Sequence, residues 1–123
     1  MSFKTLDGYK KGFSLAMDIF EVSKKFPKEE TYSLCDQVRR SSRSVCANIS
    51  EAYRKRRYVK NWISKLTDSD GENSETQVWL DFAKSCNYID HKVYDQLTER
   101  SEEVGRLINY MINNPGKFGV MED

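Results

Sequence analysis

The chain contains only two prolines, Pro27 and Pro115, and both lie outside its long periodic segments. Proline interrupts a helix interior, so long stretches without it favour helices. Within these stretches apolar residues recur at spacings of three and four, the period of one helical face. No segment has the alternating pattern of a strand. The sequence therefore predicts an all-α fold.

Four helices are expected. Phe26-Pro27 ends the first, because the residue before proline is pushed out of the α region. Asp90 is a good N-cap for the last. Short connections between amphipathic helices predict an antiparallel, up-and-down four-helix bundle. A chain of 123 residues is expected to form one domain, residues 1–123. The expected helices cover residues 5–25, 29–53, 59–85 and 90–113.

The apolar positions of the first helix predict which of its faces is buried. They recur at helical spacing and are Leu6, Tyr9, Phe13, Ala16, Met17 and Phe20. Two tryptophans, Trp62 and Trp79, are large enough that a single small bundle is not expected to bury both. The tail, residues 117–123, is expected to be loosely held.

The third helix has an unusual middle, because residues 67–75 include no apolar side chain. Gly71 lies within it and costs a helix about 1 kcal/mol relative to alanine. Two shorter helices are one alternative; a single continuous helix is favoured. On a continuous helix Asp68, Glu72 and Glu75 share one face. This acidic face could hold magnesium, or it could accept charge from arginines.

Positive charge is concentrated in residues 39–60, which carry eight basic side chains and one acidic one, Glu51. That segment is +7 while the whole chain is +1, so the rest sums to −6. Tyr53 and Tyr58 flank the densest run. Cations beside flat rings are the composition of a phosphate-and-base contact surface, although a solvated helix end has the same composition. The basic residues are Arg39, Arg40, Arg43, Arg54, Lys55, Arg56, Arg57 and Lys60.

Catalytic chemistry finds little support in the sequence. His91 is the only histidine, and no serine, cysteine or glycine-rich motif of a nucleophile or phosphate loop is present. A dinuclear metal site needs carboxylates from a second helix, and no matching set is found. No catalytic residue, metal or cofactor is therefore predicted.

The sequence also predicts a location. No signal peptide is visible, and no stretch approaches the roughly 18 apolar residues that cross a bilayer. Cys35, Cys46 and Cys86 are widely spaced and are expected to be reduced core thiols. These features predict a cytoplasmic protein without a membrane partner.

Several sequence pieces carry a family resemblance. The most specific are Gln37-x-Arg39-Arg40 and Ala47-Asn48-Ile49-x-Glu51. Others are Phe26-Pro27, Trp62-Ile63-Ser64-Lys65-Leu66, Glu75-Thr76-Gln77 and Tyr88-Ile89. From about Phe3 to Asn113 the chain resembles the four-helix-bundle family encoded in intervening sequences of bacterial 23S rRNA genes, also called the S23 ribosomal protein family.

The resemblance implies a left-handed bundle, a ring-like homopentamer, and a basic surface that binds RNA or DNA. A similar protein accompanies the reverse transcriptase of diversity-generating retroelements, which implies a nucleic-acid-processing protein as a further partner. No catalytic residues are established in the family. Two departures are visible: Ala52 stands where glycine is frequent, and polar residues 68–73 replace a small apolar stretch of the third helix.

Three functions are compatible with these features. The first is a non-enzymatic, nucleic-acid-binding homo-oligomer whose cations contact phosphates and whose Tyr53 and Tyr58 stack on bases. The second is an assembly module in which the basic band binds the acidic band of a neighbour. The third is a metal-dependent phosphohydrolase using Asp68, Glu72 and Glu75. The first is favoured.

Overall fold

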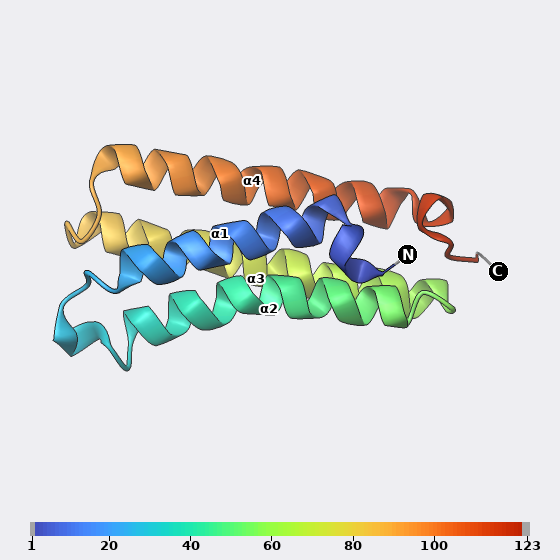
Figure 1. The fold of residues 1–123 in the computed structure, drawn as a ribbon, viewed down its shortest axis with the longest axis horizontal. Helices are drawn as coiled ribbons and strands as arrows, with labels where there is room; N and C mark the ends of the chain where they lie inside the picture. The colour runs from blue at the N-terminus through green and yellow to red at the C-terminus, as the bar shows by residue number, and fades with distance from the viewer. Residues whose placement is uncertain (1, 122–123) are drawn as a thin grey trace.

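The computed structural model describes residues 2–121, which form four long helices and three short 3₁₀ turns (Figure 1). No strand occurs among these residues, so the all-α prediction is confirmed. The helices are α1 (Asp7–Ser23), α2 (Leu34–Arg54), α3 (Val59–Ser85) and α4 (His91–Asn113). The 3₁₀ turns are η1 (Phe3–Thr5), η2 (Lys28–Glu30) and η3 (Pro115–Phe118).

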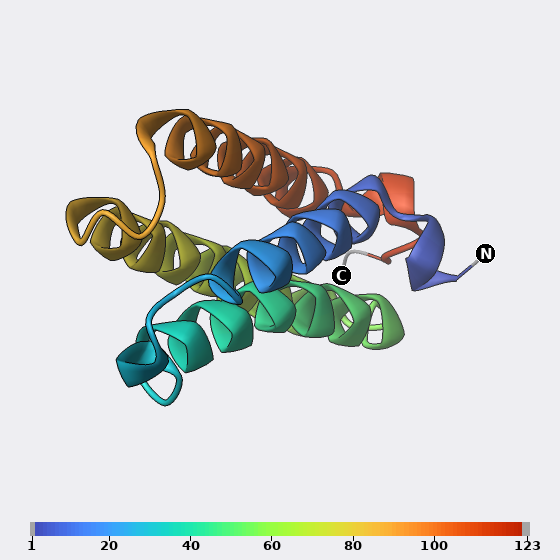
Figure 2. The same ribbon diagram turned by 60° about the vertical axis from the view of Figure 1, so that its left-hand side comes forward.

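Each helix packs on two others: α2 contacts α1 and α3, and α4 contacts α3 and α1 (Figure 2). Hydrogen bonds join Ser41 to Thr76 and Ser69 to Val45, so positions that rise along α2 fall along α3. Neighbouring helices in this pair therefore run in opposite directions. The α2–α3 connection, η1 and η3 lie at one end of the bundle (Figure 1). The left-handed twist stays a prediction.

The second helix begins at Leu34, later than residue 29, where the sequence places it. The Glu30 carboxylate accepts hydrogen bonds from the Ser33 hydroxyl and, at 3.4 Å, from the Leu34 N–H. Ser33 has a non-helical backbone with φ −125° and ψ −94°. A side chain from outside the helix thus accepts from its first N–H, and the chain turns before α2 starts.

The predicted buried face of α1 is partly wrong. Phe13 and Met17 are about half exposed, at 51% and 47%. A Cβ added to Gly12 would lie 3.3 Å from the Cys46 sulfur, so α1 approaches α2 through its glycines. Because the glycine side of α1 faces α2, the large side chains of Phe13 and Met17 lie at the surface. The interior side carries Gly8, Gly12, Leu15, Ala16 and Ile19.

The third helix is continuous through Gly71, as the sequence predicts. Its polar middle nevertheless contributes to the interior. Ser69 donates to the Val45 carbonyl at 2.8 Å. Asn73 and Ser101 exchange two hydrogen bonds of 2.9 Å, one of them through the Ser101 carbonyl. These buried polar groups are paired, so a stretch without apolar residues can lie in the core.

Trp62 is fully buried at the end that carries the α2–α3 connection, so the bundle covers one of its two tryptophans completely. Its indole N–H donates to the Met111 carbonyl at 3.1 Å, and its ring centroid lies 5.5 Å from that of Phe118. Val120 is also buried, so the tail is held at least to that position; residues 122 and 123 lie outside the described part of the chain. Trp79 is partly buried.

Two of the three cysteines fit the prediction of core thiols. Cys35 and Cys46 are buried, and burial raises the pKa of Cys46 to about 11. Cys86 is exposed. Within residues 2–121, no helix has the length and apolar character needed to cross a membrane.

Candidate nucleic-acid interface

The basic segment separates into two regions along α2. Arg43 and Arg54 are eleven positions apart, which is a rise of about 16 Å along the helix at 1.5 Å per residue. The first region, here called the side groove arginines, consists of Arg39, Arg40 and Arg43 on α2. The second, here called the end cluster, consists of Arg54, Lys55, Arg57 and Lys60.

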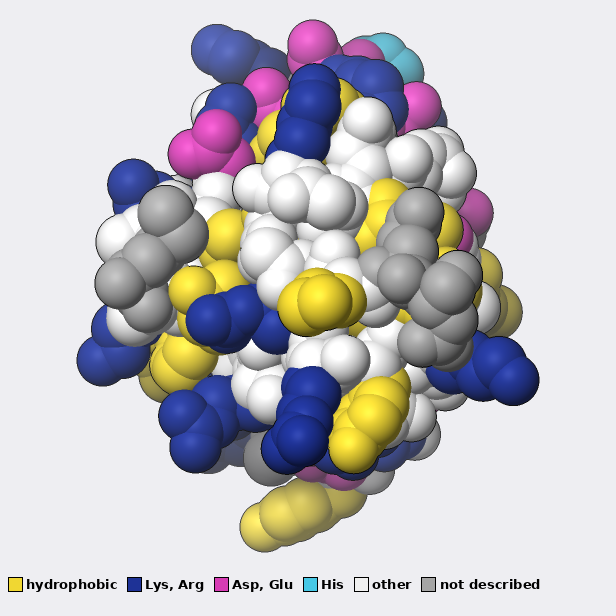
Figure 3. Space-filling model, turned by 90° about the vertical axis from the view of Figure 1, so that its right-hand side faces the viewer, with side chains coloured by type: hydrophobic (Ala, Val, Ile, Leu, Met, Phe, Trp, Pro, Cys, Tyr) yellow, Lys and Arg dark blue, Asp and Glu magenta, His cyan; other side chains and the backbone are white. Residues whose placement is uncertain are grey.

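The end cluster surrounds the connection between α2 and α3. At the end of α2, the Lys55 N–H donates to the Glu51 carbonyl at 2.9 Å. Tyr58 has an extended backbone and is the N-cap residue of α3. All four cations are exposed, and none forms an ion pair with another described residue. Figure 3 shows Lys and Arg side chains spread over this end of the molecule, while acidic side chains gather mainly along its upper edge.

Arg56 and Tyr53, both predicted to contact nucleic acid, belong to the scaffold beneath this cluster. Tyr53 is only 6% exposed, so its ring is not available for a base to stack on. The Arg56 guanidinium lies 3.8 Å from the centre of that ring and donates to the Tyr53 carbonyl at 3.0 Å. Tyr58 is 58% exposed, with Arg57 5.6 Å from its ring centre. Its ring is therefore available to a ligand at this end.

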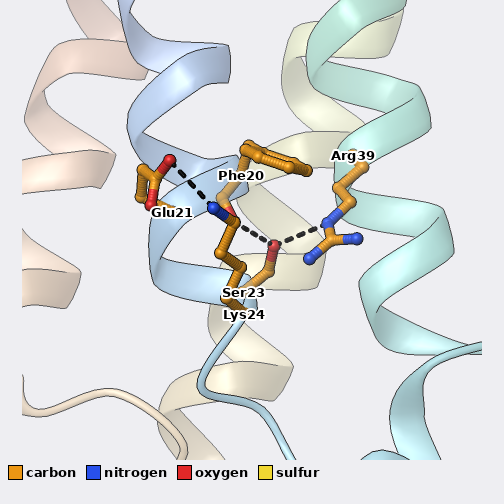
Figure 4. Close-up of polar contacts among 5 residues, drawn as sticks. All are labelled: Phe20, Glu21, Ser23, Lys24 and Arg39. Atoms are coloured by element: carbon orange, nitrogen blue, oxygen red, sulfur yellow. Dashed lines mark hydrogen bonds and ion pairs between the residues drawn. The ribbon is translucent and has the colours of Figure 1, made fainter.

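The side groove arginines line a surface depression of about 410 Å³ together with Asp36. Arg39 Nε donates to the Ser23 hydroxyl at 2.8 Å, across the seam between α2 and α1 (Figure 4). Arg40 donates to the Gln37 side chain at 3.1 Å. These two arginines are therefore oriented by hydrogen bonds, whereas none of the four end-cluster side chains donates a hydrogen bond to another residue among 2–121.

The acidic face of α3 does not form a metal site. Glu72 is half-buried, and burial raises its pKa, while the charge of Arg40 acts in the opposite direction. The Oδ2 atom of Asp68 lies 3.9 Å from Lys65 Nζ, so this carboxylate faces a cation of its own helix. Across residues 2–121 no three His, Cys, Asp or Glu side chains come together as a set that could hold a metal ion. His91 is exposed and lies 2.9 Å from Asp95.

Residue spacing did not identify the aromatic rings of Phe13 and Phe20 beside the side groove arginines. The guanidinium carbons of Arg39 and Arg43 lie 4.7 and 5.6 Å from the centre of the Phe20 ring. Phe13 lines an adjoining hollow that also contains Arg43. Both rings were assigned to the core by their spacing. The pair Gly8 and Gly12, four residues apart, is the signal that could have identified the true close-packed face.

The sequence model of the family described as 23S rRNA-intervening sequence protein matches residues 4–110. A crystal structure from Bacteroides thetaiotaomicron, of a protein with unknown function from the S23 ribosomal protein family, is similar with a TM-score of 0.78 and 27% sequence identity. The match covers 86% of this chain and 95% of that one. No curated protein matches the sequence.

Proposed function

This chain belongs to the 23S rRNA-intervening sequence protein family, and we propose that it is a non-enzymatic protein that binds RNA or DNA through phosphates. The observation that carries the proposal is the end cluster, whose four exposed cations have no ion-pair partner among residues 2–121. Cations that the fold leaves unpaired are free to replace the counterions around a phosphate backbone, which favours binding.

We further propose that the protein acts as a homo-oligomer, a pentamer in keeping with the family resemblance. Exposed apolar side chains on α3, such as Ile63 and Val78, support a surface covered by another copy. A ring repeats the end cluster once per subunit, so several weak phosphate contacts combine into high avidity. Light scattering should give a mass near five times 14.4 kDa; a mass near 14.4 kDa at micromolar concentration would refute the oligomer.

A nucleic-acid-processing protein is a further partner in this proposal, again from the family resemblance. The cytoplasm is the proposed location, and it agrees with cysteines that are all free in the structure. Free thiols are typical of a reducing compartment.

The experiment removes the end cluster and measures binding. Arg54→Ala, Lys55→Ala and Arg57→Ala together remove three exposed charges with no packing loss in the core. Fluorescence anisotropy with labelled RNA and DNA should show weaker binding without sequence selectivity, because phosphates carry no sequence information. The slope of log affinity against log salt should become shallower by about two on a single strand and about three on a duplex, since three phosphate contacts are lost.

The matched control removes the same charge from the opposite end of the bundle. Lys25, Lys28 and Lys92 are exposed, and their triple alanine variant should bind with the wild-type salt slope. Absence of binding by the wild-type protein at low salt would refute nucleic-acid binding. Equal binding by the end-cluster variant would instead favour the assembly module, in which basic side chains contact the acidic surface of a neighbour.

A further inference from the structure

A stripe of large apolar side chains lies along the seam between α1 and α2. Tyr9, Phe13, Met17 and Phe20 recur at spacings of four, four and three, so they share one side of α1. The glycine approach of α1 to α2 keeps this side out of the core. Phe13 is 51% exposed, and its ring centroid lies 6.0 Å from that of Tyr9. A ring half open to water offers a face to another flat group.

The stripe adjoins the side groove arginines. Two hollows, of about 410 and 230 Å³, share Arg43 and Ala47 in their walls. The first contains the three arginines, and the second contains Tyr9 and Phe13. Together they follow α2 from Asp36 to Ser50, a length of about 21 Å. The two hollows therefore adjoin at Arg43 and Ala47, and together they form a groove whose first part is lined by cations and whose second part is lined by rings.

The arginines in this groove are oriented rather than free. Arg39 uses Nε on the Ser23 hydroxyl, and its terminal nitrogens make no hydrogen bond with residues 2–121 (Figure 4). Its guanidinium carbon lies 4.7 Å from the centre of the Phe20 ring, and Lys24 Nζ lies at the same distance from that ring. Phe20 thus serves as a support for cations. Phe13 is the ring that remains for a ligand.

We infer that the groove between α1 and α2 binds single-stranded RNA or DNA, with a base stacked on Phe13 and phosphates on Arg39, Arg40 and Arg43. This inference rests on the proposed nucleic-acid-binding function and adds its substrate class. A duplex keeps its base faces stacked and offers phosphates but no base to a ring. A single strand offers both, which is the combination that rings and cations in one groove recognise. The Asp36 carboxylate repels phosphates and bounds the groove at its far end.

The test replaces the ring and compares strand types. Phe13→Ala should lower the affinity for an unstructured labelled single strand about 10-fold, since stacking on an aromatic side chain contributes 1–3 kcal/mol per base. Affinity for the duplex of the same sequence should not change. RNA and DNA strands are measured separately. Phe82→Ala is the matched control, because Phe82 is 54% exposed on α3 and outside the groove, and it should bind both probes as wild type does.

Each other outcome overturns the inference. Unchanged single-strand binding by Phe13→Ala, while the end-cluster variant loses binding, leaves the proposed function intact and refutes the groove. Equal loss of single-strand and duplex binding shows that the ring does not read bases. A changed oligomeric mass for Phe13→Ala, measured by light scattering, assigns the stripe to an interface between copies. No binding by the wild-type protein refutes the function and the groove together.

Discussion

The end cluster and the side groove arginines come from one basic stretch of sequence but differ in how the fold uses them. Arg39 donates a hydrogen bond to Ser23 and packs on Phe20, whereas the side chains of Arg54 and Lys60 form no hydrogen bond, ion pair or ring contact among residues 2–121. An arginine held in one orientation can select the shape of a ligand. A mobile, unpaired cation attracts any polyanion. The difference suggests that affinity resides at the end of the bundle and strand selection along its side.

The same comparison shows what a charge count in sequence can establish. It identifies a basic segment correctly, but it does not tell which cations the fold engages. Arg56 lies in the middle of the densest run and yet is stacked on Tyr53. The variants that follow separate cations that hold the fold from cations that are free.

The largest expected effect concerns the scaffold beneath the end cluster. Trp62→Ala should lower the free energy of unfolding by about 3–5 kcal/mol, because it leaves a cavity where a fully buried ring contacts Phe118 and bonds to Met111. Urea denaturation measures the loss. A loss below 1 kcal/mol would show that the end of the bundle is not a packed base for the end cluster.

Arg39 should be the cation whose removal most affects the fold. Arg39→Ala should cost about 1–2 kcal/mol of unfolding free energy, since it removes a hydrogen bond to Ser23 and packing on Phe20. Arg54→Ala should stay within about 0.5 kcal/mol of wild type. Urea denaturation of both variants provides the comparison, and equal losses would remove the distinction between engaged and free cations.

Two adjacent arginines sharpen the contrast within the densest run. Arg56→Ala should lower stability by about 1 kcal/mol through its ring contact and its bond to the Tyr53 carbonyl. Arg57→Ala should leave stability nearly unchanged and weaken nucleic-acid binding. Thermal melts and anisotropy on the same samples test the pair. The reverse pattern would place Arg56 in the interface and Arg57 in the scaffold.

A smaller effect on stability is expected from pH at the start of α2, the helix that carries the side groove arginines and leads into the end cluster. Hydrogen bonds from Ser33 and then Tyr88 hold the pKa of Glu30 below its usual 4.5. The folded state therefore favours the ionised carboxyl, and its contribution to stability is present above pH 4.5 and disappears as the pH falls through the lower folded-state pKa. In thermal melts between pH 6 and 3, the Glu30→Gln variant should lose less stability on acidification than the wild-type protein does. An unchanged acid slope would contradict this cap.

Much of the fold could be predicted from residue spacing and from the residues that end helices. The continuous third helix and the Asp90 N-cap, which accepts from the Val93 N–H at 2.8 Å, are found as expected. The face of α1 was mistaken because a stripe of exposed rings has the same period as a core stripe. Hydropathy also cannot reveal that Asn73 and Ser101 satisfy each other in the interior.

The candidate site was predictable as charge and unpredictable as geometry. Helix rise alone separates Arg43 from Arg54, so the two regions could be recognised without coordinates. The burial of Tyr53 depends on how α2 packs against its neighbours, which no local pattern encodes. The exposure of Phe13 follows from the approach of Gly12 to α2, a contact between distant parts of the chain.

The most direct test of the division between affinity and selection is the salt slope for one single-stranded RNA, measured by anisotropy on three proteins. These are wild type, the variant with Arg54, Lys55 and Arg57 changed to alanine, and Phe13→Ala. The end-cluster variant should have a slope shallower by about two, because three lost contacts contribute about 0.7 each on a single strand, and Phe13→Ala should bind about 10-fold more weakly with the wild-type slope. An unchanged slope for the end-cluster variant, or wild-type affinity for Phe13→Ala, would contradict the division.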